Sequence, residues 1–123
     1  MPSKQILIVE DETLARESLK LLIELEGFEA RAAANGREAL DIISESGLPC
    51  LIVLDMMMPL MNGWELLEAL ETRDLLRDAR IVVVSAAPDI VRSPLTRRYP
   101  ILPKPFDIES ILDIARECCE GGG

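Results

Sequence analysis

The pattern of apolar and polar positions divides the chain into five short apolar runs separated by segments with mostly helical periodicity. The runs span residues 5–9, 28–32, 50–54, 81–84 and 101–102. The runs at 50–54 and 81–84 are apolar on both faces, which is typical of central strands in a parallel sheet that helices cover on two sides. Residues 28–32 alternate apolar with charged side chains, so we expect an edge strand there.

The segments between these runs carry the start and stop signals of helices. Asn35 and Asn62 are predicted N-caps, each with a glutamate three residues later, and Asp107 is the predicted cap of the last helix. Gly27 stands where the first helix should end in a left-handed cap. That first helix carries a broad apolar stripe of the kind that faces a core, formed by Leu14, Ala15, Leu19, Leu21, Leu22 and Leu25.

Residues 88–100 are the poorest helical segment, because they contain Pro88, Pro94 and Pro100. A proline in a helix interior costs about 3 kcal/mol, so we predict an irregular or short fourth helix, or an ordered loop. Five strands alternating with helices indicate the α/β class, with a doubly wound parallel sheet and right-handed crossovers. We expect residues 1–120 to form one domain, residues 121–123 to form a flexible glycine tail, and no output domain within this sequence.

Composition restricts the function classes. The formal net charge of −9 argues against direct binding of nucleic acid, because phosphate contacts need a basic face. No apolar run approaches the roughly 20 residues of a membrane span, and the N-terminal run is too short for a signal peptide, so we expect a cytoplasmic protein without a membrane partner. The absence of histidine excludes His-dependent nucleophiles and imidazole-ligated zinc. Cys50, Cys118 and Cys119 fit no metal motif, and we expect them to be reduced thiols.

Polar residues stand at the carboxyl ends of the predicted strands. Glu10 and Asp11 follow the first run, Asp55 the third, Ser85 the fourth, and Lys104 comes just after the fifth. In a parallel sheet these ends lie along one edge, where open α/β sheets bind ligands. Three converging carboxylates repel each other unless a cation lies among them, and oxygen ligands with open positions suit Mg²⁺. A lysine and a serine add positive charge and a hydroxyl for phosphoryl oxygens, so the set predicts phosphoryl transfer onto Asp55.

Four motifs, ILIVEDE, IVLDMMMP-x-MNG, VVVSA and PKPF, occur in this order along the chain. In this order and spacing they resemble the receiver domain of two-component response regulators, over about residues 4–119. The resemblance implies a flavodoxin-like (βα)₅ fold with strand order 2-1-3-4-5. It also implies a stand-alone phosphoacceptor switch of a phosphorelay, with a histidine kinase or a histidine phosphotransfer protein as donor and a downstream protein partner whose docking changes.

The resemblance assigns a role to each polar residue at the predicted sheet edge. Asp55 would accept the phosphoryl group. Asp11 and Asp55 would ligate Mg²⁺ directly, with the backbone carbonyl of Met57 as a third ligand and Glu10 acting through water. Ser85 would hydrogen-bond the phosphoryl group.

Lys104 would form an ion pair with the phosphoryl group, and the family implies a cis peptide between Lys104 and Pro105, since only X-Pro bonds adopt cis at low cost. The protein would phosphorylate and dephosphorylate itself at Asp55 without being a turnover enzyme. Phosphohydrolases that form an aspartyl-phosphate typically carry a second aspartate two residues after the nucleophile. That position is Met57 here, which disfavours turnover on a free substrate.

Other interpretations stay open. Glu10 and Asp11 could simply favour the N-terminus of the first helix through its dipole, and Asp55 could be an ordinary turn residue. The chain could also be a receiver fragment of a larger hybrid kinase or transcription regulator, or a receiver-like scaffold that is not phosphorylated.

The sequence departs from the receiver pattern in one region. Receivers usually have an aromatic residue three positions before the lysine, where this chain has Ile101; the nearest aromatic, Tyr99, comes two residues earlier. The stretch between Ser85 and Lys104, which contains this position, is rich in proline and a few residues shorter than usual. We therefore hypothesise that phosphorylation is read without the usual coupling of a hydroxyl to a rotating aromatic ring.

Overall fold

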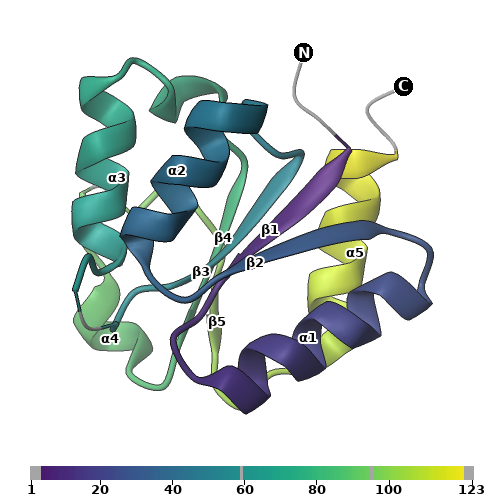
Figure 1. Ribbon diagram of the computed structural model, residues 1–123. Helices are drawn as coiled ribbons and strands as arrows, with labels where there is room; N and C mark the ends of the chain where they lie inside the picture. The colour runs from purple at the N-terminus through teal and green to yellow at the C-terminus, as the bar shows by residue number, and fades with distance from the viewer. Residues whose placement is uncertain (1–3, 59, 95, 121–123) are drawn as a thin grey trace.

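The computed structural model describes residues 4–58, 60–94 and 96–120, so Pro59 and the predicted tail at 121–123 lie outside the described residues. The elements follow the predicted alternation (Figure 1). In chain order they are β1 (Gln5–Val9), α1 (Thr13–Leu25), β2 (Glu29–Ala33), α2 (Gly36–Ser46), β3 (Leu51–Asp55), α3 (Gly63–Thr72), η1 (Leu76–Asp78), β4 (Ile81–Ser85), α4 (Pro88–Val91), β5 (Ile101–Pro103) and α5 (Ile108–Cys119). The short 3₁₀ helix η1 was not anticipated from the sequence.

The five strands form one parallel sheet in the order β2-β1-β3-β4-β5. This is the predicted flavodoxin-like order, and the predicted edge strand is indeed at the edge. Helices α2 and α3 cover one face of the sheet, and α1 and α5 cover the other (Figure 1). Because β3 lies in the middle with β1 and β4 beside it, the residue that ends β3 occupies the centre of the carboxyl edge.

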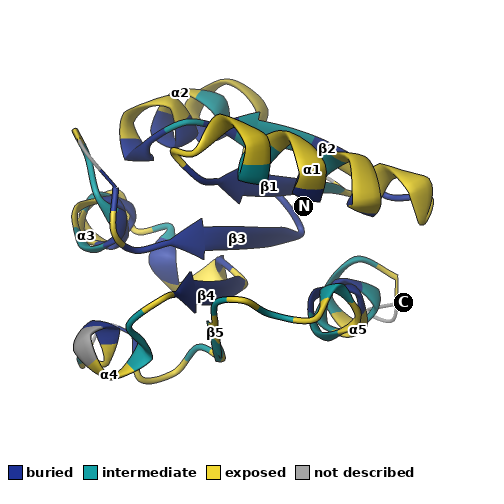
Figure 2. Cartoon of the chain, turned by 90° about the horizontal axis from the view of Figure 1, so that it is seen from below, coloured by how far each residue is buried: buried dark blue, intermediate teal, exposed yellow. Residues whose placement is uncertain are grey.

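Two apolar clusters fill the space between the sheet and its helices. Alternate side chains of each central strand enter opposite clusters, since successive residues of a strand point to opposite faces. The cluster under α2 and α3 contains Leu7, Val9, Ile52, Leu54, Ile81 and Val83 from the strands. The cluster under α1 and α5 contains Ile6, Ile8, Leu51, Val53, Val82 and Val84. β3 and β4 are buried throughout (Figure 2).

The predicted apolar stripe of α1 is only partly buried. Leu19 and Ile23 pack into the core, whereas Leu14 and Leu25 are 74% and 72% exposed. Leu21 and Leu22 are exposed as well. The stripe is wider than the strip of helix surface that the sheet and α5 can cover, so part of it faces outward, as the exposed colouring of α1 in Figure 2 shows.

The predicted helix caps are confirmed. The Asn35 side chain accepts a hydrogen bond from the Glu38 amide, and Asn62 forms a reciprocal capping box with Glu65. The Asp107 side chain accepts from the Glu109 amide at the start of α5. Gly27 follows α1 with φ of +94°, the left-handed conformation that the sequence predicts for it.

The fourth helix is short, as predicted. α4 has four residues and gives way to a turn built on Thr96, which is fully buried. The Thr96 hydroxyl donates to the Val91 carbonyl oxygen at 2.8 Å and accepts from the Ser93 amide at 2.8 Å. These bonds satisfy backbone groups of Val91 and Ser93 that a longer helix would otherwise pair.

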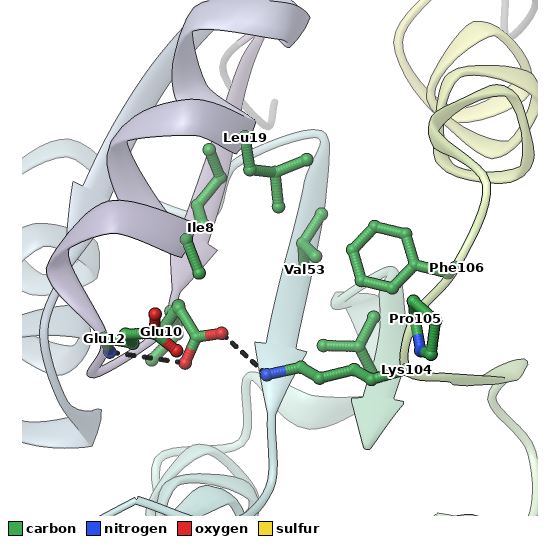
Figure 3. Close-up of a pocket in the computed structure, with 11 residues that line it drawn as sticks. Ile8, Glu10, Glu12, Leu19, Val53, Lys104, Pro105 and Phe106 are labelled. Atoms are coloured by element: carbon green, nitrogen blue, oxygen red, sulfur yellow. Dashed lines mark hydrogen bonds and ion pairs between the residues drawn. The ribbon is translucent and has the colours of Figure 1, made fainter. Parts of the chain in front are cut away.

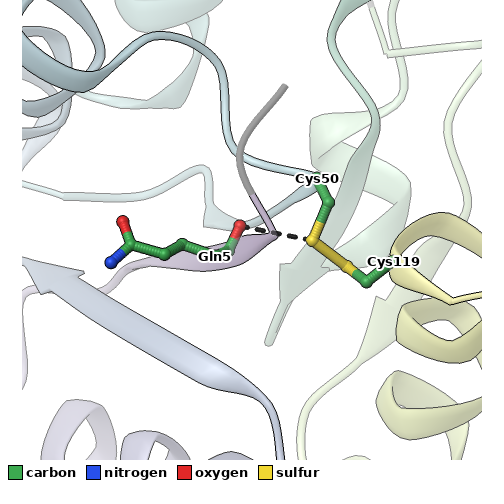
Figure 4. The surroundings of a disulfide bond; sticks show 3 residues. All are labelled: Gln5, Cys50 and Cys119. Carbon is green, nitrogen blue, oxygen red and sulfur yellow. Dashed lines mark hydrogen bonds between the residues drawn. A yellow bond between two sulfur atoms is a disulfide. The ribbon is translucent and has the colours of Figure 1, made fainter. Parts of the chain in front are cut away.

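One expectation about the cysteines is wrong. Cys50, which precedes β3, and Cys119, the last residue of α5, form a disulfide with Cα atoms 5.3 Å apart (Figure 4). Cys118 is the free cysteine. Sequence spacing did not indicate the pair because 69 positions separate the two residues, and the fold brings them together.

Candidate phosphoacceptor site

Three carboxylates meet at the carboxyl edge of the sheet, as the strand ends predicted. Asp55 ends β3, and Glu10 and Asp11 follow β1 directly. One carboxylate oxygen from each of the three lies within 4.8 Å of the other two. Asp55 and Glu10 are only 5% and 6% exposed, whereas Asp11 is exposed. The cluster therefore has two buried acids and one that faces solvent.

Lys104 provides the positive charge beside the two buried acids. Its Nζ lies 2.6 Å from Glu10 Oε1 and 3.3 Å from Asp55 Oδ2. Figure 3 shows the lysine side chain extending across the site toward Glu10. Burial by itself lowers the pKa of Lys104, but the hydrogen bond that Lys104 donates to Glu10 and the negative charges of Asp55 and Glu10 outweigh burial and raise that pKa above its usual value. The ammonium therefore stays protonated and partly neutralises the cluster.

The loops of the edge hold these side chains by backbone bonds. Asp55 Oδ1 accepts from the Met57 amide at 3.1 Å, and the Lys104 amide donates to the Ser85 carbonyl oxygen at 2.8 Å. The Lys104–Pro105 peptide bond is cis, as the resemblance implied. These contacts fix both Asp55 and the backbone of Lys104 at the carboxyl ends of β3 and β5.

Ser85 ends β4, one residue beyond Val84, which pairs with Asp55 in the sheet register. Its side chain is 1% exposed, and its hydroxyl accepts a hydrogen bond from the Ala87 amide at 3.0 Å. Within the described ranges, the structure records no bond from this hydroxyl to Asp55 or to Lys104. Ser85 therefore stands at the predicted edge with its hydroxyl held by its own loop.

The loop after Asp55 depends on one glycine. The Gly63 amide donates to the Met56 carbonyl oxygen at 3.0 Å, and a Cβ at Gly63 would lie 2.7 Å from Met56 Cα. Only glycine permits this approach of two backbones. Met56 and Met58 are buried in the core and Met57 is 53% exposed, so two of the three methionines pack the loop against the core and Met57 stays at the surface.

Arg16 is a residue of the site that the sequence analysis did not identify. Its Nη1 donates to the backbone carbonyl oxygens of Glu10 at 3.0 Å and Asp11 at 3.2 Å. Arg16, which lies in the first turn of α1, thus holds the loop that carries both acids. The only signal in the sequence is an arginine placed shortly after an acidic pair, which is too common to be informative.

A cavity of about 450 Å³ adjoins the acidic cluster (Figure 3). Its walls are mainly apolar, with Ile8, Leu19, Val53 and Phe106 among the lining residues, and Glu10, Glu12 and Lys104 provide its polar groups. The cavity lies between α1 and the loop that leads from Lys104 into α5.

The profile of the family described as "Response regulator receiver domain" matches residues 6–116. The chain belongs to this family. It is 32% identical over 120 residues to the sporulation initiation phosphotransferase F of Bacillus subtilis, covering 95% of this chain and 94% of that protein. It is 37% identical over 111 residues to the response regulator MprA of Mycolicibacterium vanbaalenii, covering 88% of this chain but only 47% of that protein. The chain thus spans about half the length of some of its curated relatives.

Solved receiver structures have the same architecture. The response regulator TrrA of Thermotoga maritima, in complex with Mg²⁺ and BeF, has a TM-score of 0.80 at 28% identity, with 96% of this chain and 99% of that chain covered. The receiver domain of the hybrid histidine kinase CckA has a TM-score of 0.76 at 31% identity, with 94% and 99% covered. Receiver domains are signalling switches of two-component systems, and this chain has the fold and the acidic cluster of such a domain.

In the part of the chain that the structure describes, none of the helices could span a bilayer.

Proposed function

We propose that this receiver domain accepts a phosphoryl group on Asp55 from a phosphohistidine of a histidine kinase or a histidine phosphotransfer protein. A carboxylate oxygen of Asp55 forms the new P–O bond while the P–N bond of the phosphohistidine breaks. The leaving imidazole keeps the electron pair of the P–N bond and takes up a proton. The transfer is an exchange between two proteins, so Asp55 acts as a stoichiometric acceptor and the domain is not a turnover enzyme.

The observation that carries this proposal is the position of Lys104. Its ammonium lies 3.3 Å from a carboxylate oxygen of the buried Asp55, at the edge where a ligand would approach. A phosphoryl group on Asp55 brings additional negative charge beside this cation, so Lys104 would exchange its contact with Asp55 for the phosphoryl oxygens. The Ser85 hydroxyl at the end of β4 would donate to another phosphoryl oxygen once it rotates away from the Ala87 amide.

The donor set fits Mg²⁺, which binds oxygen ligands and keeps several waters. We propose that Asp11 and Asp55 hold the ion directly, with the Met57 backbone carbonyl as a third ligand and Glu10 acting through water. When bound, Mg²⁺ neutralises charge on the transferring phosphoryl group. Asp11 is exposed, so a Mg²⁺ ion from solvent can reach its carboxylate directly. The buried carboxylates of Glu10 and Asp55 provide negative charge that attracts the ion.

A small-molecule phosphodonor such as acetyl phosphate tests the proposal without a partner. The intact mass should increase by one phosphoryl group in the presence of Mg²⁺ and not in the presence of EDTA. The Asp55→Asn variant should show no increase, and the matched variant Asp41→Asn, an exposed aspartate of α2, should behave as the wild type. Mg²⁺-dependent phosphorylation of Asp55→Asn to the wild-type extent would refute the assignment.

We propose that phosphorylation changes docking on a downstream protein, and that the protein works in the cytoplasm, where kinases of this type present their phosphohistidine. One relative that this chain matches over nearly the full length of both proteins is named a sporulation initiation phosphotransferase, which favours a phosphorelay role. Some relatives are about twice as long as this chain, which is consistent with this domain acting as the receiver of a larger regulator. A chain whose Asp55 is never phosphorylated, in spite of normal folding and Mg²⁺ binding, would instead be a scaffold.

We further propose that the phosphorylated state is read without a rotating aromatic ring. Ile101 is half-buried against the core cluster under α2 and α3, and Tyr99 packs against the same cluster two residues earlier. α4 has four residues, so a rigid displacement of a long helix is not available. NMR spectra with and without beryllofluoride and Mg²⁺ should show changes concentrated in residues 86–100. A conventional shift of α4 together with a new Ile101 rotamer would contradict this proposal.

A further inference from the structure

A disulfide lies at the opposite end of β3 from the acidic cluster. Cys50 stands just before this strand and Asp55 ends it, so five residue steps, roughly 16 Å of extended chain, separate them. Cys119 reaches Cys50 from the last turn of α5 (Figure 4). The disulfide therefore ties the C-terminal end of α5 to the start of the strand that carries the phosphoacceptor.

The surroundings of Cys50 suit both oxidation states. Its sulfur lies 3.3 Å from the backbone carbonyl oxygen of Gln5, and a dashed line marks this contact in Figure 4. In the disulfide this sulfur carries no hydrogen, whereas a reduced Cys50 could donate its S–H to the Gln5 oxygen. The thiol form thus has an acceptor in place, and the buried cysteine is not left unpaired when the disulfide opens.

The two cysteines differ in how solvent reaches them. Cys50 is 6% exposed, whereas Cys119 is half-buried at the end of a helix. A small oxidant therefore meets Cys119 first, and Cys50 is positioned to complete the bond from inside. Cys118, half-buried beside Cys119, remains a free thiol in the structure and provides a natural control.

We propose that Cys50 and Cys119 form a reversible oxidation site for low-molecular-weight disulfides, which gives this receiver a covalent input separate from phosphorylation. The proposal rests on the cytoplasmic location given under the proposed function, because disulfides in a reducing compartment are mostly transient or redox-sensing. Oxidation fastens the end of α5 to the sheet, and reduction releases it. α5 is the helix that follows the Lys104 loop, so this input acts on an element adjacent to the site.

The reaction is two thiol–disulfide exchanges. The Cys119 thiolate attacks one sulfur of the small disulfide, forms a mixed disulfide and releases one small thiolate. The Cys50 thiolate then attacks the Cys119 sulfur, forms the Cys50–Cys119 bond and releases the second small thiolate. The two protons lost by the cysteines are taken up by the two small thiolates. The protein is oxidised by two electrons, and one small disulfide is reduced to two thiols.

Oxidised glutathione added to the fully reduced chain tests the proposal. After alkylation of free thiols and intact mass measurement, the reduced protein should carry three labels and the oxidised protein one, and excess reduced glutathione should restore three. Cys118→Ser should still form the bond, whereas Cys50→Ser should stop at a mixed disulfide. Cys50→Ser is expected to fold, since a serine hydroxyl can donate to the same Gln5 oxygen.

Thermal unfolding gives a second readout. Oxidation of the wild type and of Cys118→Ser should raise the melting temperature by on the order of 10 °C, because the bond closes a long loop in the unfolded chain. Cys50→Ser should show no such rise. A bond that resists excess reduced glutathione would overturn the proposed reversibility, and oxidation that yields only glutathionylated or intermolecularly linked protein would overturn the site. Asp55→Asn should be oxidised like the wild type, so a failure here is distinguishable from a failure of the proposed phosphoacceptor function.

Discussion

Replacing Lys104 with methionine is the sharpest perturbation of the acidic cluster. Methionine keeps much of the apolar stem of the lysine and removes the ammonium, which lies 2.6 Å from Glu10 and 3.3 Å from Asp55. Within the described residues, no other cationic side chain is recorded in an ion pair with these two acids. The variant therefore leaves two buried carboxylates beside each other without a compensating charge.

The size of the effect follows from the burial of the three groups. Removing one partner of a buried ion pair costs about 3–5 kcal/mol, because the remaining charge stays desolvated. The Lys104 side chain is 29% exposed, so solvent screens part of the interaction and we expect a loss of about 2 kcal/mol. In urea this corresponds to a midpoint lower by roughly 1–2 M, at the slopes usual for small domains. Mg²⁺ should recover part of the loss by restoring positive charge to the cluster.

Urea unfolding followed by circular dichroism, at fixed ionic strength and without Mg²⁺, measures this loss. Lys20→Met is the matched control, since Lys20 forms an ion pair of 3.1 Å with the exposed Glu24 on the surface of α1. Surface pairs of this kind contribute about 0.3–0.5 kcal/mol. Equal and small losses in both variants would refute the view that Lys104 compensates two buried charges.

Three further outcomes are expected. Asp11→Asn should abolish most of the rise in melting temperature that Mg²⁺ produces. Without Mg²⁺ the variant should be as stable as the wild type or more stable, because one of three clustered negative charges is gone. An undiminished Mg²⁺ response would exclude Asp11 as a ligand. The stability difference between wild type and Lys104→Met should be fully present below pH 10.5, the ordinary lysine pKa, and should disappear as the pH rises through the higher folded-state pKa of Lys104; a difference that is constant across that range in urea titrations would contradict the raised pKa. Tyr99→Phe should leave the free energy of unfolding unchanged or raise it by up to about 1 kcal/mol, because the Tyr99 hydroxyl is buried without a hydrogen-bond partner among the described residues. A marked loss of stability, measured by denaturant unfolding, would show that this hydroxyl has a partner.

The arrangement of the site was predictable because it depends on topology. Parallel strands place their carboxyl ends along one edge, so an aspartate at the end of a strand that is apolar on both faces had to come near the acids that follow the neighbouring strand. Asp55, Glu10 and Asp11 meet as this rule requires. The cap residues were predictable for a similar reason, since Asn62 and Glu65 act on backbone groups three residues away.

The features that were missed depend on distances that a linear pattern does not contain. Cys50 and Cys119 approach each other only because α5 packs back along the sheet, and cysteine spacing carries no information about this. The apolar pattern of α1 predicted more buried residues than the structure shows, because Leu14 and Leu25 are apolar but lie on a part of the helix that the sheet does not cover. The Lys104 contact with Glu10 was not foreseen either. It depends on how far the ammonium reaches across the sheet edge, where Glu10 Oε1 lies closer to it than Asp55 Oδ2 does.

The assignment of Asp55 as the phosphoacceptor is tested by locating the phosphoryl group after reaction with acetyl phosphate and Mg²⁺. An acyl phosphate on an aspartate can be trapped by reduction with borohydride, which converts that side chain to an alcohol, and peptide mass spectrometry then identifies the modified residue. The assignment predicts modification at Asp55 alone, with Glu10 and Asp11 unmodified. Modification at another residue, or a phosphoryl group that is stable to borohydride and hydroxylamine as a serine ester would be, would contradict it.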